Sequence, residues 1–331
     1  MPTPLIICDD SSFARKQMAR ALPEHWDVDV TFAANGQEAL EAIRKGKGEI
    51  LFLDLNMPVM DGYQTLAAIR REDLPVMTIV VSGDVQPEAH KRVTALGALD
   101  FIRKPVDPEQ VSEILRRYGI DIESRATRQH IEVETDLLDA AQEVANIAMG
   151  RAGDLLARLL GAFVVLPVPR VNHLDVGELQ MLLEQVDQDK GTVGVCQGFI
   201  GAGIAGEAML VFHESSFTDI ARLMKYDGEI DEAVQLELLM DISGILIGAC
   251  LKGIADQLDL CFSQGHPIVL GTHVKTADLI ERNAPRWGRT LAIEMGYTIE
   301  GHDISCDLLL LFTGDSIDAL NDRLSCLGGN A

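Results

Sequence analysis

The sequence predicts an α/β protein built from two domains, and three observations support this. The chain has 331 residues, which is more than a single hydrophobic core usually spans. In the first third, short apolar runs alternate five times with amphipathic stretches, as is typical of parallel strands joined by helical crossovers. The remainder contains one pattern twice, about 100 residues apart. We expect domains at 1–120 and 136–331, with a polar linker at 121–135.

The alternation in the first domain predicts a doubly wound, five-stranded parallel sheet with helices on both faces. The strands are expected at 5–8, 28–32, 50–53, 76–81 and 98–102. The helices are expected near 12–21, 37–45, 62–71, 87–96 and 107–117. The carboxyl ends of parallel strands share one edge of the sheet, and ligands bind beside that edge. Polar residues at the strand ends therefore indicate a site.

Charge and composition exclude several classes of function. The 28 Lys and Arg residues against 51 Asp and Glu residues give a net charge of −23, which disfavours binding to nucleic acid or to an anionic membrane. No apolar run approaches the roughly 20 residues of a membrane-spanning helix, and the first residues do not resemble a secretory signal. The six cysteines are scattered without metal-ligand spacing. We therefore expect a cytoplasmic protein that binds neither nucleic acid nor membrane.

Polar residues gather at the predicted carboxyl ends of four strands. They are Asp9 and Asp10 after the first strand, Asp54 after the third, Ser82 at the end of the fourth and Lys104 after the fifth. Three carboxylates in one crevice repel one another unless a cation offsets them, and a few oxygen ligands suit Mg2+. This set describes a phosphoryl group on Asp54, although any single Asp here is also compatible with a helix cap.

These residues, together with the stretch from Asp54 to Gly62, resemble the receiver domain of two-component response regulators, which has a flavodoxin-like fold. The resemblance covers about residues 3–118 and implies a phosphoprotein in a two-component phosphorelay. It implies a histidine kinase as phosphodonor, Asp54 as phosphoacceptor, Mg2+ as cofactor and a cis peptide before Pro105. The further implied roles are metal binding by Asp9, Asp10, Asp54 and the backbone carbonyl of Asn56, phosphate contacts by Ser82 and Lys104, and a switch position at Phe101.

The second domain aligns with itself. A pattern of polar and glycine positions on one predicted long helix recurs 98 residues later, and later segments match at an offset of 100. The matched positions are Asp139, Glu143, Asn146 and Gly150 in the first copy, and Glu237, Asp241, Gly244 and Gly248 in the second. We infer an α/β domain of two repeats, about 137–228 and 232–328. A pseudo-twofold axis would relate the repeats, and their long helices would pack on a shared sheet.

At about 100° per residue, Asp139, Glu143 and Asn146 share one stripe of the first long helix, away from its apolar side. Three polar residues on one helix face are also compatible with a solvated surface. An Asn in mid-helix without a capping role, and the repetition of the pattern, argue for a function. The pattern resembles the helix motif of CheC-type chemotaxis phosphatases, a group that includes CheX and FliY, over about residues 132–328.

This resemblance implies that the helix docks on a phosphorylated CheY-type receiver as its substrate. Glu143 would bind the lysine of the receiver, Asn146 would orient a water against the aspartyl phosphate, and Asp139 would have a minor catalytic role. In the second repeat Asp241 replaces Glu and Gly244 replaces Asn. The three positions Glu237, Asp241 and Gly244 are therefore expected to form a degenerate second site.

Two functions of different class follow. The first is a response regulator whose CheC-like output is a phosphatase, a hydrolase for a CheY-type receiver that could be its own, regulated by phosphorylation of Asp54. The alternative is a non-enzymatic module that phosphorylation switches between chemotaxis or flagellar partners. The pair Glu143 and Asn146 favours the enzyme, because binding alone does not require both residues. The sequence leaves a homodimer open.

Overall fold

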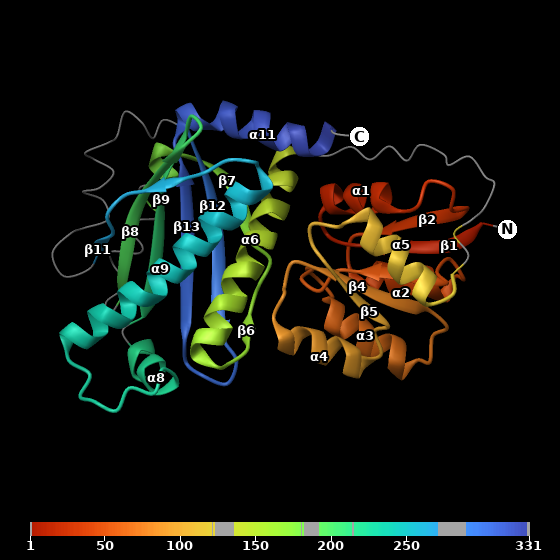
Figure 1. Ribbon diagram of the computed structural model, residues 1–331, viewed down its shortest axis with the longest axis horizontal. Coiled ribbons are helices and arrows are strands. Elements are labelled where there is room, and N and C mark those ends of the chain that lie inside the picture. Colours follow the sequence, from red (N-terminus) through yellow and green to blue (C-terminus); the bar gives the residue numbers. More distant parts are fainter. Residues whose placement is uncertain are drawn as a thin grey trace. The chain divides into compact units, whose positions relative to one another are not determined.

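The computed structural model describes residues 2–120, 122, 136–179, 181, 192–213, 215–270 and 289–329 (Figure 1). The protein divides into two compact units, Met1–Glu143 and Val144–Ala331. Of the expected linker, only Ile122 belongs to the described residues. The first unit contains the expected first domain and also the first two turns of the long helix α6 (Leu137–Leu160), which the sequence had assigned to the second domain.

The first unit is built on a five-stranded parallel sheet in the order β2-β1-β3-β4-β5, with flanking helices. This confirms the doubly wound, flavodoxin-like prediction, and each boundary lies within two residues of its expected position. The strands are β1 (Thr3–Cys8), β2 (Val28–Ala33), β3 (Ile50–Leu53), β4 (Met77–Ser82) and β5 (Asp100–Arg103). The helices are α1 (Ser12–Ala21), α2 (Gly36–Arg44), α3 (Gly62–Arg71), α4 (Pro87–Leu96) and α5 (Pro108–Arg117).

Both faces of this sheet are buried, which explains why its strands read as continuous apolar runs. Successive side chains of a strand point to opposite faces, so Ile6 and Leu51 join one buried cluster while Leu5 and Phe52 join the other. The helices begin at polar caps: Ser11 caps α1, and Asp61 forms a capping box with Gln64 at the start of α3.

The register of the strands brings the predicted polar residues to one edge. Cys8 of β1 lies opposite Leu53 of β3, and Ser82 of β4 lies opposite Arg103 of β5. The next residues along the chain are Asp9, Asp54 and Lys104, so they emerge side by side at the carboxyl edge. The sheet topology thus positions the candidate site.

The second unit contains one eight-stranded sheet to which both repeats contribute, as expected, and its ladders are antiparallel. The strand order is β10-β8-β9-β13-β12-β6, with β11 beside β8 and β7 beside β12. The first repeat supplies β6 (Val164–Val165), β7 (Arg170–Asp175), β8 (Thr192–Gly201), β9 (Ile204–His213) and α8 (Ser216–Leu223) in addition to α6. The second supplies α9 (Glu232–Gln257), β10 (Ser263–Gln264), β11 (Ile268–Leu270), β12 (Arg289–Ile299), β13 (Ser305–Phe312), η2 (Gly314–Ser316) and α11 (Ile317–Gly329).

The registers of this sheet repeat at the offsets seen in the sequence. At its centre Met209 of β9 faces Leu309 of β13, a residue and its own counterpart 100 positions later. The pair Arg170 and Glu294 between β7 and β12 recurs as Ile268 and Cys196 between β11 and β8, at an offset of 98. The short strands of each repeat therefore extend the hairpin of the other repeat. A pseudo-twofold axis through the β9–β13 pair describes this arrangement.

The two long helices α6 and α9 lie side by side across one face of the sheet (Figure 1). A Cβ added to Gly253 of α9 would lie 2.9 Å from Ala148 Cα of α6, so glycine permits this close approach. Gln257 Nε2 donates to the Val144 carbonyl at 3.0 Å. Within the described part of the chain, α9 alone is long and apolar enough to cross a membrane, but 61% of its apolar window is buried in the protein, as befits a core helix.

Candidate functional site

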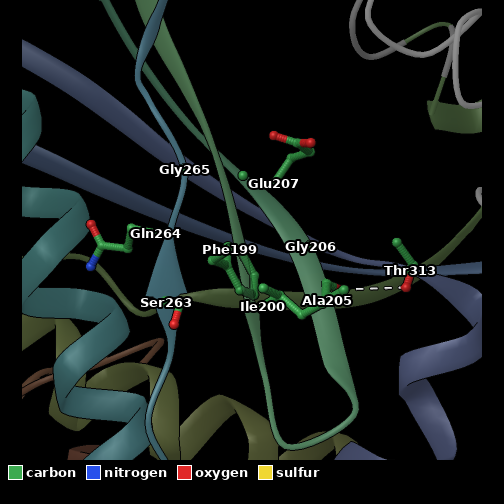
Figure 2. Close-up of a pocket in the computed structure, with 10 residues that line it drawn as sticks. Phe199, Ile200, Ala205, Gly206, Glu207, Ser263, Gln264, Gly265 and Thr313 are labelled. Atoms are coloured by element: carbon green, nitrogen blue, oxygen red, sulfur yellow. Dashed lines mark hydrogen bonds between the residues drawn. The ribbon is translucent and has the colours of Figure 1, made fainter.

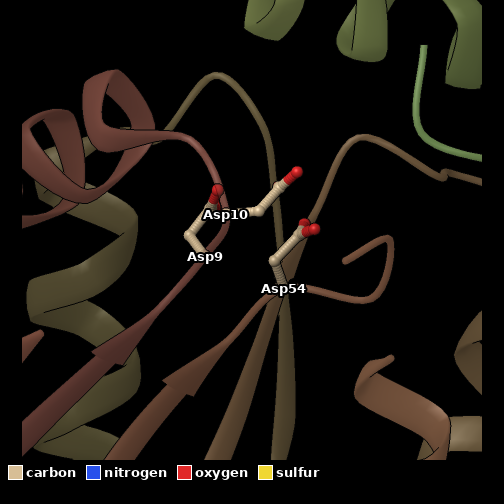
Figure 3. A group of neighbouring side chains, drawn as sticks. All are labelled: Asp9, Asp10 and Asp54. Atoms are coloured by element: carbon tan, nitrogen blue, oxygen red, sulfur yellow. The ribbon is translucent and has the colours of Figure 1, made fainter. Parts of the chain in front are cut away.

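Three carboxylates meet at the carboxyl edge of the first sheet (Figure 3). Asp9 and Asp10 follow β1 and Asp54 follows β3, and one oxygen of each lies within 4.8 Å of the others. Asp9 and Asp54 are buried. The Asn56 amide donates to Asp54 Oδ2 at 2.9 Å, whereas Asp54 Oδ1 is buried without a hydrogen bond. Clustered carboxylates with an unsatisfied oxygen fit a hard divalent cation such as Mg2+.

A single buried lysine supplies positive charge to this cluster. Lys104 Nζ lies 2.7 Å from Asp9 Oδ2 and 3.2 Å from Asp54 Oδ1, the latter at ion-pair distance but without hydrogen-bond geometry. The peptide between Lys104 and Pro105 is cis, as the resemblance implied. The structure thus brings Asp9, Asp10, Asp54 and Lys104 together, as the strand ends predicted.

Burial controls the protonation of this cluster. Burial raises the pKa of Asp54 well above its ordinary value, against the opposing effect of Lys104. Burial, followed by the charge of Asp9, raises the pKa of Asp10 to about 6. Burial by itself would lower the pKa of Lys104, but Asp54, Asp9 and Glu143 outweigh it and raise that pKa well above its ordinary value. The site therefore carries excess negative charge, which a bound cation would relieve.

Three other predicted residues are less directly engaged. Ser82 is buried, and its Oγ accepts a hydrogen bond from the Asp84 amide at 3.2 Å. The half-buried Phe101 ring has its centroid 5.6 Å from that of His90. The backbone amide of Asn56 donates to Asp54 Oδ2. The backbone carbonyl of Asn56 is the group that the resemblance assigns to the metal. The roles of these residues toward phosphate, switching and metal stay predictions.

Two residues beside the acidic cluster, Arg15 and Gly62, were not among the predicted site residues. Arg15 Nη1 donates to the carbonyl oxygens of Asp9 and Asp10 at 2.5 and 3.2 Å and so fixes the acidic loop. The sequence feature that could have identified Arg15 is a basic residue five positions after an acidic pair, near the start of a helix. Gly62 permits a close approach of two backbone segments, because a Cβ there would lie 2.3 Å from the Asp54 carbonyl oxygen.

The first two turns of α6 add two carboxylates to the first unit. Glu143 is buried, and its Oε1 lies 3.1 Å from Lys104 Nζ. Burial raises the pKa of Glu143 to about 7, although Lys104 opposes this. Asp139 Oδ2 accepts hydrogen bonds from the Phe13 amide at 2.8 Å and from Ser12 Oγ. A void of about 10 Å³, the size of one water, is bordered by Asp9, Lys104 and Glu143 among others.

Asn146 follows one turn later on α6, in the second unit. It is 5% exposed, and its buried Oδ1 has no hydrogen-bond partner within the part of the chain that the structure describes. The sequence placed this ridge of α6 away from the core and did not predict its burial. Buried amide oxygens are usually hydrogen-bonded in proteins, so this Oδ1 is an acceptor that is still available to a donor.

The matching ridge of α9 differs. Glu237, Asp241 and Gly244 are all exposed. A Cβ added at Gly244 or Gly248 would meet no atom within 4 Å, so no packing requires glycine at either position. The second repeat therefore lacks both the amide and the buried setting of the first.

The second unit also has a pocket of about 350 Å³ at the end of the β8–β9 hairpin (Figure 2). Among the described residues that line it, Glu207 is the one titratable residue, and burial raises the pKa of its carboxyl. Cys196 Sγ lies 3.4 Å from Glu207 Oε2, and Thr313 Oγ1 donates to the Ala205 carbonyl at 3.3 Å. No residue of the predicted sites is among the described residues that line this pocket.

Comparisons with known proteins match parts of the chain. Residues 5–116 match the family described as response regulator receiver domain. This part of the chain is therefore a CheY-like receiver domain. A protein-glutamate methylesterase/protein-glutamine glutaminase of Geobacillus kaustophilus is 31% identical over 205 residues, which cover 55% of this chain and 58% of that relative. The chain thus spans little more than half the length of this relative.

Two solved structures are also similar in part. The crystal structure of Thermotoga maritima FliY is 17% identical with a TM-score of 0.41, over 60% of this chain and 100% of that one. A chain of the CheX–CheY–BeF3–Mg2+ complex from Borrelia burgdorferi is 28% identical with a TM-score of 0.33, over 37% of this chain and 92% of that one.

Proposed function

We propose that this response regulator is an aspartyl-phosphate phosphatase, in which the α6 ridge hydrolyses the phosphate of a CheY-type receiver. The observation that carries the proposal is the distance of 3.1 Å between Glu143 Oε1 and Lys104 Nζ. Lys104 is the lysine that the receiver resemblance assigns to the phosphoryl group. A CheC-type helix would contact that lysine with this glutamate, so the receiver of the chain itself is a fitting substrate.

In this proposal a histidine kinase donates the phosphoryl group to Asp54. Asp10, Asp54 and the Asn56 carbonyl would hold Mg2+ directly, and Asp9 would hold it through water. When bound, the ion supplies positive charge against the phosphate oxygens. Ser82 and Lys104 would contact the same oxygens, and Phe101 would respond to their presence.

Hydrolysis then requires a positioned water. The water oxygen forms a bond to phosphorus while the bond between phosphorus and the Asp54 oxygen breaks, and the bonding electrons stay on Asp54. Phosphate leaves as H2PO4−, which carries both protons of the water. An acyl phosphate is already reactive, so catalysis consists chiefly of orientation and charge neutralisation. Asn146, whose Oδ1 has no hydrogen-bond partner among the described residues, is the residue suited to orient this water.

The second repeat supports the same assignment by contrast. Asp241 is one methylene shorter than Glu143, and Gly244 has no side chain to hold a water. We assign Glu237, Asp241 and Gly244 to a degenerate site whose helix is retained because α9 fills the core.

Substitution of Asn146 by Ala tests the proposal. In the full chain phosphorylated on Asp54 by a small acyl phosphate, we expect Asn146→Ala to slow the release of inorganic phosphate by about 10- to 100-fold. Glu237→Ala, at the counterpart of Asp139, serves as the control and should leave the rate unchanged. An unchanged rate in Asn146→Ala would overturn the phosphatase assignment and favour the non-enzymatic module.

The Geobacillus relative favours a second candidate, hydrolysis of glutamyl esters or glutaminyl amides in proteins. Its support is that the 205 aligned residues extend past the receiver match at 31% identity. Release of methanol or ammonia from a glutamyl-methylated or glutamine-bearing receptor protein measures this activity. Under the phosphatase proposal neither product forms above the rate without protein.

A further inference from the structure

The start of α1 is capped twice, once from its own loop and once from α6. Ser11 Oγ accepts a hydrogen bond from the Ala14 amide at 3.0 Å, which is the ordinary cap of this helix. The Phe13 amide donates to Asp139 Oδ2 at 2.8 Å. Ser12 Oγ donates to the same oxygen. One carboxylate oxygen of α6 thus accepts from two donors of the receiver.

The receiver sequence leaves this position open for a carboxylate. The first four amides of a helix have no partner within the helix, and the helix dipole favours negative charge beside them. Many helices place an Asp or Glu in their own first turn, but α1 has no acidic residue there. Asp139 therefore satisfies a donor and a dipole that no residue of α1 satisfies.

Glu143 is also engaged with the receiver, and Asn146 follows it on the ridge. Glu143, one turn after Asp139, lies 3.1 Å from Lys104 Nζ. Asn146, one turn later again, is 5% exposed with an unpartnered Oδ1. The three side chains project from successive turns, about 6 Å and about 4.5 Å apart along the helix axis. Asp139 and Glu143 thus engage the first unit from two successive turns of α6, and Asn146 lies on the next turn of the same helix.

We propose that Asp139 is a positioning residue, not a catalytic one, and that its grip on Ser12 and Phe13 commits the α6 ridge to the receiver of its own chain. This inference rests on the proposed phosphatase function and identifies its substrate. It replaces the minor catalytic role expected from the sequence, because Asp139 is engaged at the start of α1 rather than with the reacting atoms.

Rates of Asp54 phosphate loss in the full chain test the positioning role. Loss of a helix cap changes an equilibrium by about 2- to 30-fold, and we expect Asp139→Ala to slow hydrolysis within that range. Asp139→Asn keeps an acceptor oxygen without the charge and should fall between Asp139→Ala and the unsubstituted chain. Glu237→Ala is the matched control. If Asp139→Ala leaves the rate of phosphate loss unchanged while Asn146→Ala slows it, the positioning role of Asp139 is wrong but the phosphatase function stands. If neither substitution changes the rate, the phosphatase function itself is wrong.

Hydrogen exchange separates positioning from a general loss of structure. The Phe13 amide of the full chain should exchange faster in Asp139→Ala than in Glu237→Ala, while amides in β8 and β9 exchange equally in both variants. Equal protection of Phe13 in the two variants contradicts the contact.

A mixing experiment tests whether the substrate belongs to the same chain. The full chain with Asn146→Ala is phosphorylated on Asp54 and mixed with a tenfold excess of chain that carries Asp54→Asn and an intact ridge. We expect the half-life of the phosphate to be the same with and without the excess chain. A half-life that shortens in proportion to the added chain would show that the ridge serves receivers of other molecules.

Discussion

The long helices α6 and α9 are copies of one element with different surfaces. Both cross the same face of the sheet, and their ridge positions correspond at an offset of 98. On α6 the ridge residues Glu143 and Asn146 are buried, whereas on α9 Asp241 and Gly244 are exposed. On the sides that face the core, α9 carries the larger apolar residue: Leu246 of α9 stands where α6 has Ala148. One copy carries the candidate chemistry, and the other contributes more apolar surface to the core.

This division is possible because the copies cannot separate. The short strands of each repeat pair with the hairpin of the other, so both repeats share one sheet and one core. A change on the α9 ridge then has no structural penalty as long as its apolar side is kept. The comparison therefore predicts that substitutions in α9 affect stability and that substitutions on the α6 ridge affect hydrolysis.

The largest expected effect on stability is at the core side of α9. Leu246 is fully buried, and Leu246→Ala should lower the free energy of unfolding by about 2–5 kcal/mol through lost burial and the cavity left behind. Denaturant unfolding of the full chain measures this. Leu155→Ala on α6, where the side chain is 45% exposed, is the control and should cost far less. Equal losses would show that the two helices share the core evenly.

Loss of charge on the two ridges should affect hydrolysis unequally. Glu143→Gln removes the ion pair with Lys104 and should slow loss of the Asp54 phosphate about tenfold, equivalent to about 1.4 kcal/mol. Asp241→Asn changes the matching carboxylate on the exposed ridge and should leave the rate unchanged. Phosphate release from the full chain is the measurement. Similar effects of both substitutions would contradict the proposed degeneracy of the second site.

Two glycines of α9 should respond to alanine with opposite signs. Gly253→Ala forces a Cβ to within 2.9 Å of Ala148 Cα and should destabilise the protein by about 1–3 kcal/mol. Gly244→Ala meets no neighbouring atom and should stabilise it by about 0.5–1 kcal/mol, because Ala loses less conformational entropy in a helix. Thermal or denaturant unfolding tests both. If Gly244→Ala lowered the stability instead, the added methyl group would have to clash with a neighbouring group on the exposed ridge of α9.

The smallest effect concerns two carboxylates at matching positions of the sheet, Glu207 and Asp307. Burial raises the pKa of both, and His213 and Arg170 oppose this at Asp307. A carboxyl with a raised pKa in the folded state destabilises the protein as pH rises above the ordinary value of 4.5, because its ionised form is less favourable there. Glu207→Gln should thus be slightly stabilising at pH 7 and neutral at pH 4. Asp307→Asn should gain less. If Glu207→Gln instead stabilised the protein at pH 4, burial of the ionised carboxylate would not be the cause of the effect.

The local patterns of the sequence predicted most of the receiver and the layout of the repeats. Apolar runs and amphipathic stretches depend on neighbours a few residues away, so the five strands and five helices of the first sheet were recognisable. Their parallel order in turn implied that Asp9, Asp54 and Lys104 meet at one edge, which the structure confirms. The offsets of 98 and 100 residues also reappear in the strand registers.

The rest depended on contacts between residues far apart in the chain. Nothing near Asp139 indicates that it caps a helix more than 120 residues earlier, and nothing near Asn146 indicates its burial. The exchange of short strands between repeats was equally hidden, because hydrogen-bonded edges are matched in space and not along the sequence. Sequence alone determined whether each ridge position has a carboxylate, an amide or no side chain, since these are properties of single residues. Only the tertiary structure decided which donors they meet and which of them are withdrawn from water, since both depend on the packing of distant segments.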